Sequence, residues 1–295
     1  MAQDTADGPV REVRFVSPGE AALATRERLP LPAGRVRVQT RFSLVSTGTE
    51  LAYLDGSHHD VAEGRCTFPM GAKGGYSNVG VIVETAPDVT GWRAGQRVFS
   101  MTGHASEALP TPGLMTPVPD SVSDGQAAFA AVGSIALHGV RMGDVRLGHT
   151  VLVTGLGLIG QLAVRIARLA GAARVLATDP SAPRLDMALD AGAVPLDTDP
   201  GAAVQVAIEC SGHPAAIRDC IRLVADEGVV VLLGCPHRPV ELDLYTDFQK
   251  RQLRLVGAYQ PKCPAAPSAA YPWSQSINRA QVLAWLGEGA LDVDS

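Results

Sequence analysis

The chain has 295 residues, of which 46% are hydrophobic and 19% are charged, a composition typical of a globular protein of about two domains. Its formal net charge of −5 argues against a surface that binds nucleic acid or an acidic membrane. The sequence has no apolar run long enough to span a membrane, no signal peptide, and five cysteines without a C-x-x-C pair. We therefore expect a cytoplasmic protein without a disulfide framework or a four-cysteine zinc lobe.

The first hundred residues consist of short β-rich runs that glycine and proline interrupt. This pattern, from Val13 to about Ser100, predicts a compact, mostly antiparallel β-domain. A proline-rich passage follows. Ser123 then has the setting of a helix N-cap, ahead of an alanine-rich helix over 127–132 and a second helix over 135–141.

Residues 150–179 read as a strand, a glycine turn, a helix, a second strand and an acid. Gly155 allows the sharp turn, Gly157 lets a pyrophosphate approach the backbone, and Gly160 lets the helix pack close to the strand. The free N–H groups of the helix N-terminus favour a phosphate there. Asp179 can accept hydrogen bonds from a ribose diol and would repel a 2′-phosphate. The motif therefore predicts binding of NAD rather than NADP.

Strands and helices alternate through the rest of the chain. The pattern predicts helices from the cap Ser181 through Leu189, over 214–224 and over 276–286, and strands over 204–208, 229–233 and 253–256. Such alternation predicts a parallel sheet with helices on both faces and ligands at the carboxyl ends of the strands.

The segments SLVSTGTE (43–50), GYSNVGVIVE (75–84), GWRAGQRVFS (91–100) and VTGLGLIG (153–160) resemble the medium-chain dehydrogenase/reductase superfamily of zinc-type, alcohol dehydrogenase-like proteins. The wording of the first two is similar to that of bacteriochlorophyllide dehydrogenase-like proteins. The resemblance covers nearly the whole chain and implies an α/β protein. A GroES-like catalytic β-domain (1–124) would precede a Rossmann NAD-binding domain with a doubly wound parallel sheet (125–265). The last segment (266–295) would return toward the catalytic domain in shortened form, and the active site would lie in the cleft between the domains.

The resemblance also implies which residues bind the cofactor, NAD. They are Gly155, Gly157, Leu158, Ile159 and Gly160 at the pyrophosphate, Asp179 and Arg184 on the adenosine side, and Ser211, Gly212 and Gly234 along the nicotinamide half through backbone contacts. Relatives are often homodimers or homotetramers, and we expect the same here, with a small molecule as substrate.

The sequence departs from zinc-containing relatives at the metal. Those proteins hold a catalytic zinc with a Cys before G-T-D, a His in a G-H-E motif and a third ligand. Thr47, Tyr76 and Val132 stand at the matching positions. Since a catalytic zinc needs about three protein ligands, we predict that the protein holds no zinc.

Without a metal, the charge that develops on a carbonyl oxygen needs a proton donor or hydrogen-bond donors. The resemblance places Thr49 at the hydroxyl that relays protons, with Glu50 placed to orient it. It places the Tyr76 phenol at the nicotinamide cleft and His104 in a loop that borders the cleft. Tyr76 could equally be a core aromatic residue with a satisfied hydroxyl. For His104, a functional and a structural role are equally open.

Two further residues are weaker candidates. His138 lies on an apolar helix, a setting more typical of a structural histidine, and Lys73 lies in a glycine-rich loop ahead of Tyr76.

The leading functional hypothesis is a zinc-independent, NAD(H)-dependent oxidoreductase that interconverts a secondary alcohol and a ketone on a small cyclic or polyol-like metabolite. Two alternatives stay open. One is an enoyl or enone reductase of the same superfamily, and the other is a catalytically silent NAD-binding partner or sensor protein.

Overall fold

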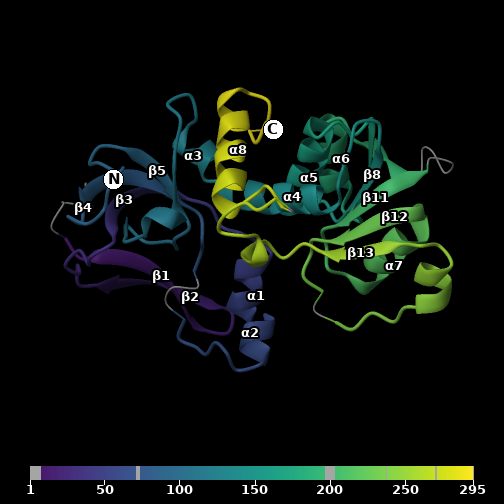
Figure 1. Cartoon of the computed structure of the whole chain (residues 1–295). Coiled ribbons are helices and arrows are strands. Elements are labelled where there is room, and N and C mark those ends of the chain that lie inside the picture. The colour runs from purple at the N-terminus through teal and green to yellow at the C-terminus, as the bar shows by residue number, and fades with distance from the viewer. Residues whose placement is uncertain (1–7, 71–73, 197–202, 237, 270, 295) are drawn as a thin grey trace. The chain divides into compact units, whose positions relative to one another are not determined.

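The computed structural model describes residues 8–70, 74–196, 203–236, 238–269 and 271–294 (Figure 1). Contacts divide the chain into two compact units. Unit 1 contains residues 1–131 and 279–288, and unit 2 contains residues 132–278 and 289–295. Helix α8 (Gln275–Gly287) contributes residues to both. No helix in the described ranges is long and apolar enough to cross a membrane.

Unit 1 contains a five-stranded sheet with the order β6-β3-β4-β5-β7 and a two-stranded sheet, β1-β2, and all strand pairs are antiparallel. The strands are β1 (Val10–Ser17), β2 (Glu20–Arg26), β3 (Val36–Ser43), β4 (Asn78–Thr85), β5 (Arg97–Ser100), β6 (Glu107–Ala108) and β7 (Met115–Pro117). Alternating apolar side chains of these strands form a buried cluster that includes Val36, Val38 and Ile82. The predicted antiparallel β-domain is confirmed.

The prediction of β-runs alone up to Ser100 is wrong for one stretch, which forms helices α1 (Thr49–Asp55) and α2 (His59–Ala62). Local hydrogen bonding explains α1. In its first turn the Glu50 carboxylate accepts a hydrogen bond from the Ser46 N–H, and the helix ends at Gly56, whose φ of 83° is left-handed.

The N-cap at Ser123 is confirmed, because Ser123 and Gln126 form a reciprocal capping box. The helix that it caps, α3 (Asp124–Ala127), is shorter than the prediction and lies earlier. A second helix, α4 (Ala130–Met142), covers the remainder of both predicted helices. The break between them was therefore misplaced by about one turn. A 3-10 turn, η1 (Pro112–Leu114), lies ahead of β7.

Unit 2 is a six-stranded parallel sheet with the order β10-β9-β8-β11-β12-β13. Its elements are β8 (Thr150–Thr154), α5 (Leu158–Leu169), β9 (Arg174–Thr178), α6 (Ala182–Asp190), β10 (Val194–Pro195), β11 (Val204–Glu209), α7 (Pro214–Leu223), β12 (Val224–Leu232), η3 (Leu244–Gln249), β13 (Arg254–Gly257) and η4 (Gln260–Lys262). The strand order reverses between β8 and β11, which makes their carboxyl ends the usual ligand position of a doubly wound sheet. The predicted Rossmann architecture is confirmed.

The central strands of unit 2 are buried on both faces. Val151, Leu152 and Val153 are fully buried, which is why β8 reads as a continuous apolar run. Helix α7 packs Ile217 and Cys220 into the cluster that contains Leu152. Figure 1 shows α5 and α6 on one side of this sheet and α7 on the other.

Candidate active site and cofactor site

A buried hydrogen-bond network in unit 1 joins three of the residues that the sequence puts forward for catalysis. Glu50 is 3% exposed, and its Oε2 lies 2.8 Å from His104 Nε2. Its Oε1 accepts a hydrogen bond from the Ser46 backbone N–H over 2.7 Å. His104 Nδ1 lies 2.8 Å from Ser43 Oγ. The Tyr76 hydroxyl donates to Ser46 Oγ over 2.5 Å.

The register of β3 and β4 brings these segments together. Ser43, the last residue of β3, pairs with Asn78, the first residue of β4. The chain just after β3 therefore runs beside the chain just before β4, and Leu44 N–H donates to the Ser77 carbonyl over 3.1 Å. This neighbouring path is what places Tyr76 against Ser46.

Glycines make room for His104. Gly75 has a φ of 95°, and a Cβ built on it would lie 2.5 Å from His104 Nε2. A Cβ on Gly103 would lie 2.7 Å from the Gly74 carbonyl, which accepts a hydrogen bond from His104 N–H over 2.8 Å. A side chain at Gly75 would push the imidazole away from Glu50, and one at Gly103 would push against the carbonyl that holds the His104 backbone.

The structure thus brings Tyr76, Glu50 and His104 into one network, but it does not give Glu50 the orienting role expected for it. One carboxylate oxygen of Glu50 bonds to the Ser46 N–H and the other to His104. Thr49, in the first turn of α1, makes no side-chain hydrogen bond within the described residues. Sequence reasoning missed Ser43 and Ser46. The only signal for them is their place in the SLVSTGTE segment.

The donor set of this region does not fit a catalytic zinc. Nowhere in the described ranges do three or more His, Cys, Asp or Glu side chains gather as a metal would require. Glu50 and His104 are two such groups, and they bond to each other. Thr47 is exposed, and the Tyr76 hydroxyl is directed to Ser46. Three protein ligands of the usual kinds are therefore not assembled here.

In unit 2, the glycine turn after β8 has the shape that a pyrophosphate requires. Gly155 has a φ of 79°, and a Cβ on it would lie 2.7 Å from Ser211 Cβ. A Cβ on Gly160 would lie 2.0 Å from the Gly155 carbonyl oxygen. A Cβ on Gly157 would meet nothing within 4 Å, so this position faces open space at the N-terminus of α5. Leu158 and Ile159 follow in the first turn, where helix N–H groups lack intrahelical acceptors.

Asp179 ties this turn to the end of β9. Its Oδ2 accepts a hydrogen bond from Leu156 N–H over 2.6 Å, and its Oδ1 accepts one from Ser181 N–H over 2.8 Å. The predicted capping of α6 by the Ser181 side chain is wrong, since Ser181 makes no side-chain cap hydrogen bond. Arg184 lies exposed in the first turn of α6, and its carbonyl accepts a hydrogen bond from Gln161 Nε2 over 2.7 Å.

A carboxylate that the sequence analysis overlooked organises the end of β11. Glu209 is fully buried, and its side chain accepts hydrogen bonds from Ser211 N–H (2.7 Å), from Gly212 N–H (2.9 Å to Oε2) and from the Ser211 hydroxyl. Its carbonyl accepts one from Gly234 N–H over 2.8 Å. Burial raises the pKa of the Glu209 carboxyl, and the hydrogen bonds from Ser211 and Gly212 oppose that rise.

This arrangement limits which atoms of Ser211, Gly212 and Gly234 can contact a cofactor. Their N–H groups all bond to Glu209, so contacts to a ligand fall to their carbonyl oxygens and Cα atoms. Gly212 has a φ of 68°, and a Cβ on it would lie 2.2 Å from the Cys235 carbonyl oxygen. The overlooked signal is a charged residue that closes the apolar strand VQVAIE.

Cysteines near this edge are not activated thiols. Burial raises the pKa of the Cys220 thiol to about 12, and burial also raises the pKa of Cys210 well above its usual value. Both remain protonated at neutral pH. They behave as small apolar side chains.

His138 has a structural setting in unit 2. It is 4% exposed, and its Nδ1 lies 2.8 Å from the Tyr271 hydroxyl. Arg141, one turn further along α4, stacks 3.6 Å from the ring centroid of Trp273. Burial and, next, the Arg141 charge lower the pKa of His138. Lys73 lies outside the described residues.

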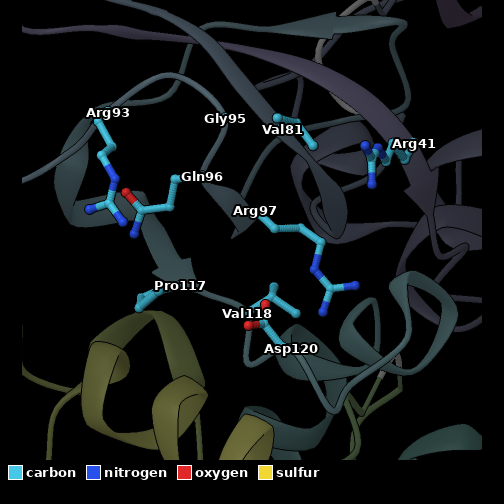
Figure 2. Close-up of a pocket in the computed structure, with 9 residues that line it drawn as sticks. All are labelled: Arg41, Val81, Arg93, Gly95, Gln96, Arg97, Pro117, Val118 and Asp120. Carbon is cyan, nitrogen blue, oxygen red and sulfur yellow. The ribbon is translucent and has the colours of Figure 1, made fainter.

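Unit 1 also carries an open pocket of about 560 Å³ on the turn between β4 and β5 (Figure 2). Figure 2 shows Arg93 and Gln96 on one side of it and Arg41 on the other. Arg97, also in its lining, donates to the Pro119 carbonyl over 2.5 Å and pairs with Asp124 at 3.2 Å. None of the residues predicted for catalysis or cofactor binding lines this pocket.

Known proteins are similar to this chain in sequence and in fold. The family model for zinc-binding dehydrogenases matches residues 159–275. D-guloside 3-dehydrogenase of Escherichia coli (strain K12) is 30% identical over 254 residues, which cover 75% of this chain and 72% of that protein.

Two solved structures show the same fold. One is a protein from Sinorhizobium meliloti 1021 described as a zinc-binding dehydrogenase and bound to NADP, with a TM-score of 0.80, 22% identity and coverage of 97% of this chain and 91% of that one. The other is an alcohol dehydrogenase of Escherichia coli CFT073 complexed with NADH, with a TM-score of 0.78, 18% identity and coverage of 97% and 90%.

Proposed function

Because the chain belongs to the zinc-type, alcohol dehydrogenase-like family of medium-chain dehydrogenases/reductases, we propose that it is a zinc-independent, NAD(H)-dependent oxidoreductase that interconverts a secondary alcohol and a ketone on a small cyclic or polyol-like molecule. The dehydrogenase name of the relative, together with the NADP and NADH bound in the two solved structures, supports an oxidoreductase of secondary alcohols that uses a nicotinamide cofactor. The name of the relative D-guloside 3-dehydrogenase supports a sugar-ring hydroxyl as the substrate class.

The observation that carries the zinc-independent part is the bond between Tyr76 and Ser46. A bound NAD⁺ would supply the hydride acceptor for the carbinol carbon, and the alcohol proton would need an acceptor from the protein. Tyr76 is partly exposed and Ser46 is buried behind it. If Tyr76 turns its hydrogen from Ser46 to a ketone oxygen, the Ser46 hydroxyl can donate to the phenolate that remains. Ser46 therefore stabilises the deprotonated form that alcohol oxidation starts from.

Glu50 and His104 serve this pair by holding the backbone of Ser46. The Ser46 N–H is fixed by Glu50 Oε1, and Glu50 is fixed by His104, which bonds to Ser43. A side chain with such a chain of partners keeps a defined orientation, which is what positioning of a proton donor requires.

The cofactor is held by unit 2 in this proposal. Gly157 and the N-terminus of α5 would hold the pyrophosphate, since open space and N–H groups meet there. Each Asp179 oxygen accepts one backbone hydrogen bond and keeps a lone pair for a ribose hydroxyl. A 2′-phosphate would meet that carboxylate, which supports NAD(H) over NADP(H).

A labelled cofactor tests the reaction. The protein is incubated with NADH that carries deuterium at both C4 positions, together with a panel of cyclic sugar-like ketones and cyclic enones. Mass spectrometry and NMR locate the label. We expect deuterium on the carbinol carbon of the product.

Two other results would replace the proposed function with one of its alternatives. Deuterium on the β-carbon of an enone would make the protein an enone reductase. Transfer to no substrate, together with measured NADH binding, would favour a silent NAD-binding protein.

A further inference from the structure

Glu209 is a buried carboxyl group without a salt bridge among the described residues, and the charge of His213, four residues further along, has the smallest influence on its pKa. Glu209 has no exposure to solvent, and its side chain accepts hydrogen bonds from the backbone of Ser211 and Gly212 and from the Ser211 hydroxyl. No salt bridge to Glu209 occurs within the described ranges. Burial of a lone carboxylate is costly, so its retention calls for a compensating role.

The geometry indicates that this carboxyl is ionised. Both oxygens accept N–H hydrogen bonds from Gly212, at 3.1 Å to Oε1 and 2.9 Å to Oε2. Ser211 adds its N–H and its hydroxyl to Oε1. The Ser211 hydroxyl can donate or accept, but the N–H groups of Ser211 and Gly212 can only donate, and between them they contact both oxygens. This pattern matches a carboxylate, because a protonated carboxyl would present one O–H to a donor.

We propose that Glu209 sets the relative affinity of the enzyme for oxidised and reduced cofactor. The nicotinamide ring carries a positive charge in NAD⁺ and none in NADH. A buried negative charge at the end of β11 stabilises the cationic ring and leaves the neutral ring unaffected. The inference rests on the proposed function, because it requires the nicotinamide half to lie at the carboxyl ends of β11 and β12.

The size of the effect follows from Coulomb attraction in a partly desolvated site. At separations of about 10 Å and an effective dielectric constant near 20, a single charge changes an affinity ratio by roughly ten- to twentyfold. The same effect raises the fraction of bound cofactor in the oxidised form. The charge therefore favours binding of the oxidised cofactor, the form that accepts a hydride from an alcohol.

The test compares dissociation constants for NAD⁺ and NADH in the wild type and in Glu209→Gln. Calorimetry gives the first constant, and fluorescence of the bound dihydronicotinamide gives the second. The amide is nearly isosteric but has no charge. We expect Glu209→Gln to weaken binding of NAD⁺ relative to binding of NADH by roughly ten- to twentyfold. Glu209→Asp, which keeps the charge, should restore most of the wild-type ratio.

Two matched controls separate charge from loop shape. Ser211→Ala removes a hydrogen bond to Glu209 and leaves its charge, so it should weaken both cofactor forms alike. Asp219→Asn removes an exposed carboxylate on α7 that pairs with Arg222 and should leave the ratio unchanged. A charge-independent role would instead move NAD⁺ and NADH together in Glu209→Gln, and that result would overturn the proposal.

A second measurement keeps the proposal testable if Glu209→Gln does not fold. In the wild type, the ratio of the affinities for NAD⁺ and NADH should stay constant between about 50 and 500 mM NaCl. Salt over this range screens surface charges strongly but screens a buried charge little. A ratio that falls steeply with salt would assign it to exposed charges and contradict the role of Glu209. Failure of the wild type to bind either cofactor would instead contradict the proposed function itself.

Discussion

The Tyr76 hydroxyl donates to Ser46 Oγ over 2.5 Å, across 30 residues of sequence. This bond makes Tyr76 the first residue to test. In Tyr76→Phe we expect turnover to fall roughly 10²- to 10⁴-fold, the usual contribution of a positioned proton donor, because phenylalanine cannot exchange a proton with the substrate. Affinity for NADH should stay within about twofold of wild type, since the phenol is not part of the cofactor site.

The control for this variant is Tyr53→Phe. Tyr53 lies in the same unit and donates its hydroxyl hydrogen to Asp60 Oδ2 over 2.7 Å, away from the network. Steady-state kinetics with the preferred alcohol provide the measurement. Unchanged turnover in Tyr76→Phe would remove Tyr76 from the reaction.

The second prediction concerns Glu50. In Glu50→Gln, one amide oxygen must serve where two carboxylate oxygens now bond to Ser46 N–H and His104. We expect a loss of about 1–3 kcal/mol in the free energy of unfolding, typical of a buried group left without its partner. We also expect turnover to fall about tenfold, because Ser46 would no longer be held beneath Tyr76.

Chemical denaturation and kcat measured on the same preparations check this. Glu63→Gln is the matched control, since Glu63 is exposed and pairs with Arg65 on the surface. If Glu50→Gln kept wild-type turnover while losing stability, Glu50 would be a structural residue only.

The third prediction concerns cofactor choice. Asp179→Ser removes the charge that faces a 2′-phosphate and releases the N–H groups of Leu156 and Ser181. Arg184 is exposed nearby in the first turn of α6. We expect the ratio of kcat/KM for NADP(H) to that for NAD(H) to rise at least about tenfold, equivalent to ~1.4 kcal/mol. Asp186→Asn, an exposed carboxylate of the same helix, should leave the ratio unchanged. An unchanged ratio in Asp179→Ser would show that Asp179 acts only as a link between loops.

The fourth prediction is a pH dependence of stability. The pKa of His138 is lowered in the folded protein, chiefly by burial, from its ordinary value of 6.5. As the pH falls below about 6.5, the unfolded chain therefore takes up a proton at this residue before the folded chain does. Stability that is present above this pH is lost as the pH falls toward the folded-state value.

Thermal unfolding measured from about pH 8 to about pH 5.5, a range that includes the ordinary histidine pKa of 6.5, tests this effect. The melting temperature of the wild type should fall more steeply over the acidic part than that of His138→Asn, whose amide can still reach the Tyr271 hydroxyl but does not titrate. Parallel profiles for the two proteins would contradict the assignment to His138.

The fifth prediction concerns the metal. The donor set around Glu50 and His104 supplies fewer ligands than a catalytic zinc requires. Purified protein should contain less than about one zinc per ten chains, and its activity should survive dialysis against EDTA. Stoichiometric zinc by elemental analysis, with activity lost on chelation and restored by zinc, would overturn zinc independence.

The sequence by itself determined those features whose chemistry is local. The glycine turn, helix α5 and Asp179 follow one another within thirty residues, and each needs only its neighbours to be recognised. The alternation of strands and helices also determined the parallel sheet, because right-handed crossovers leave few other arrangements. Where the periodicity was weak, as at the break between α3 and α4, the predicted boundary moved by about a turn.

Tertiary structure alone decided which polar groups meet. Ser46 lies beside Tyr76 because Ser43 and Asn78 are paired in the β3–β4 register, and His104 reaches Glu50 because Gly75 leaves space for its ring. Such contacts depend on register and on the free volume left by glycine. Both are properties of segments distant in sequence, and no local pattern encodes them.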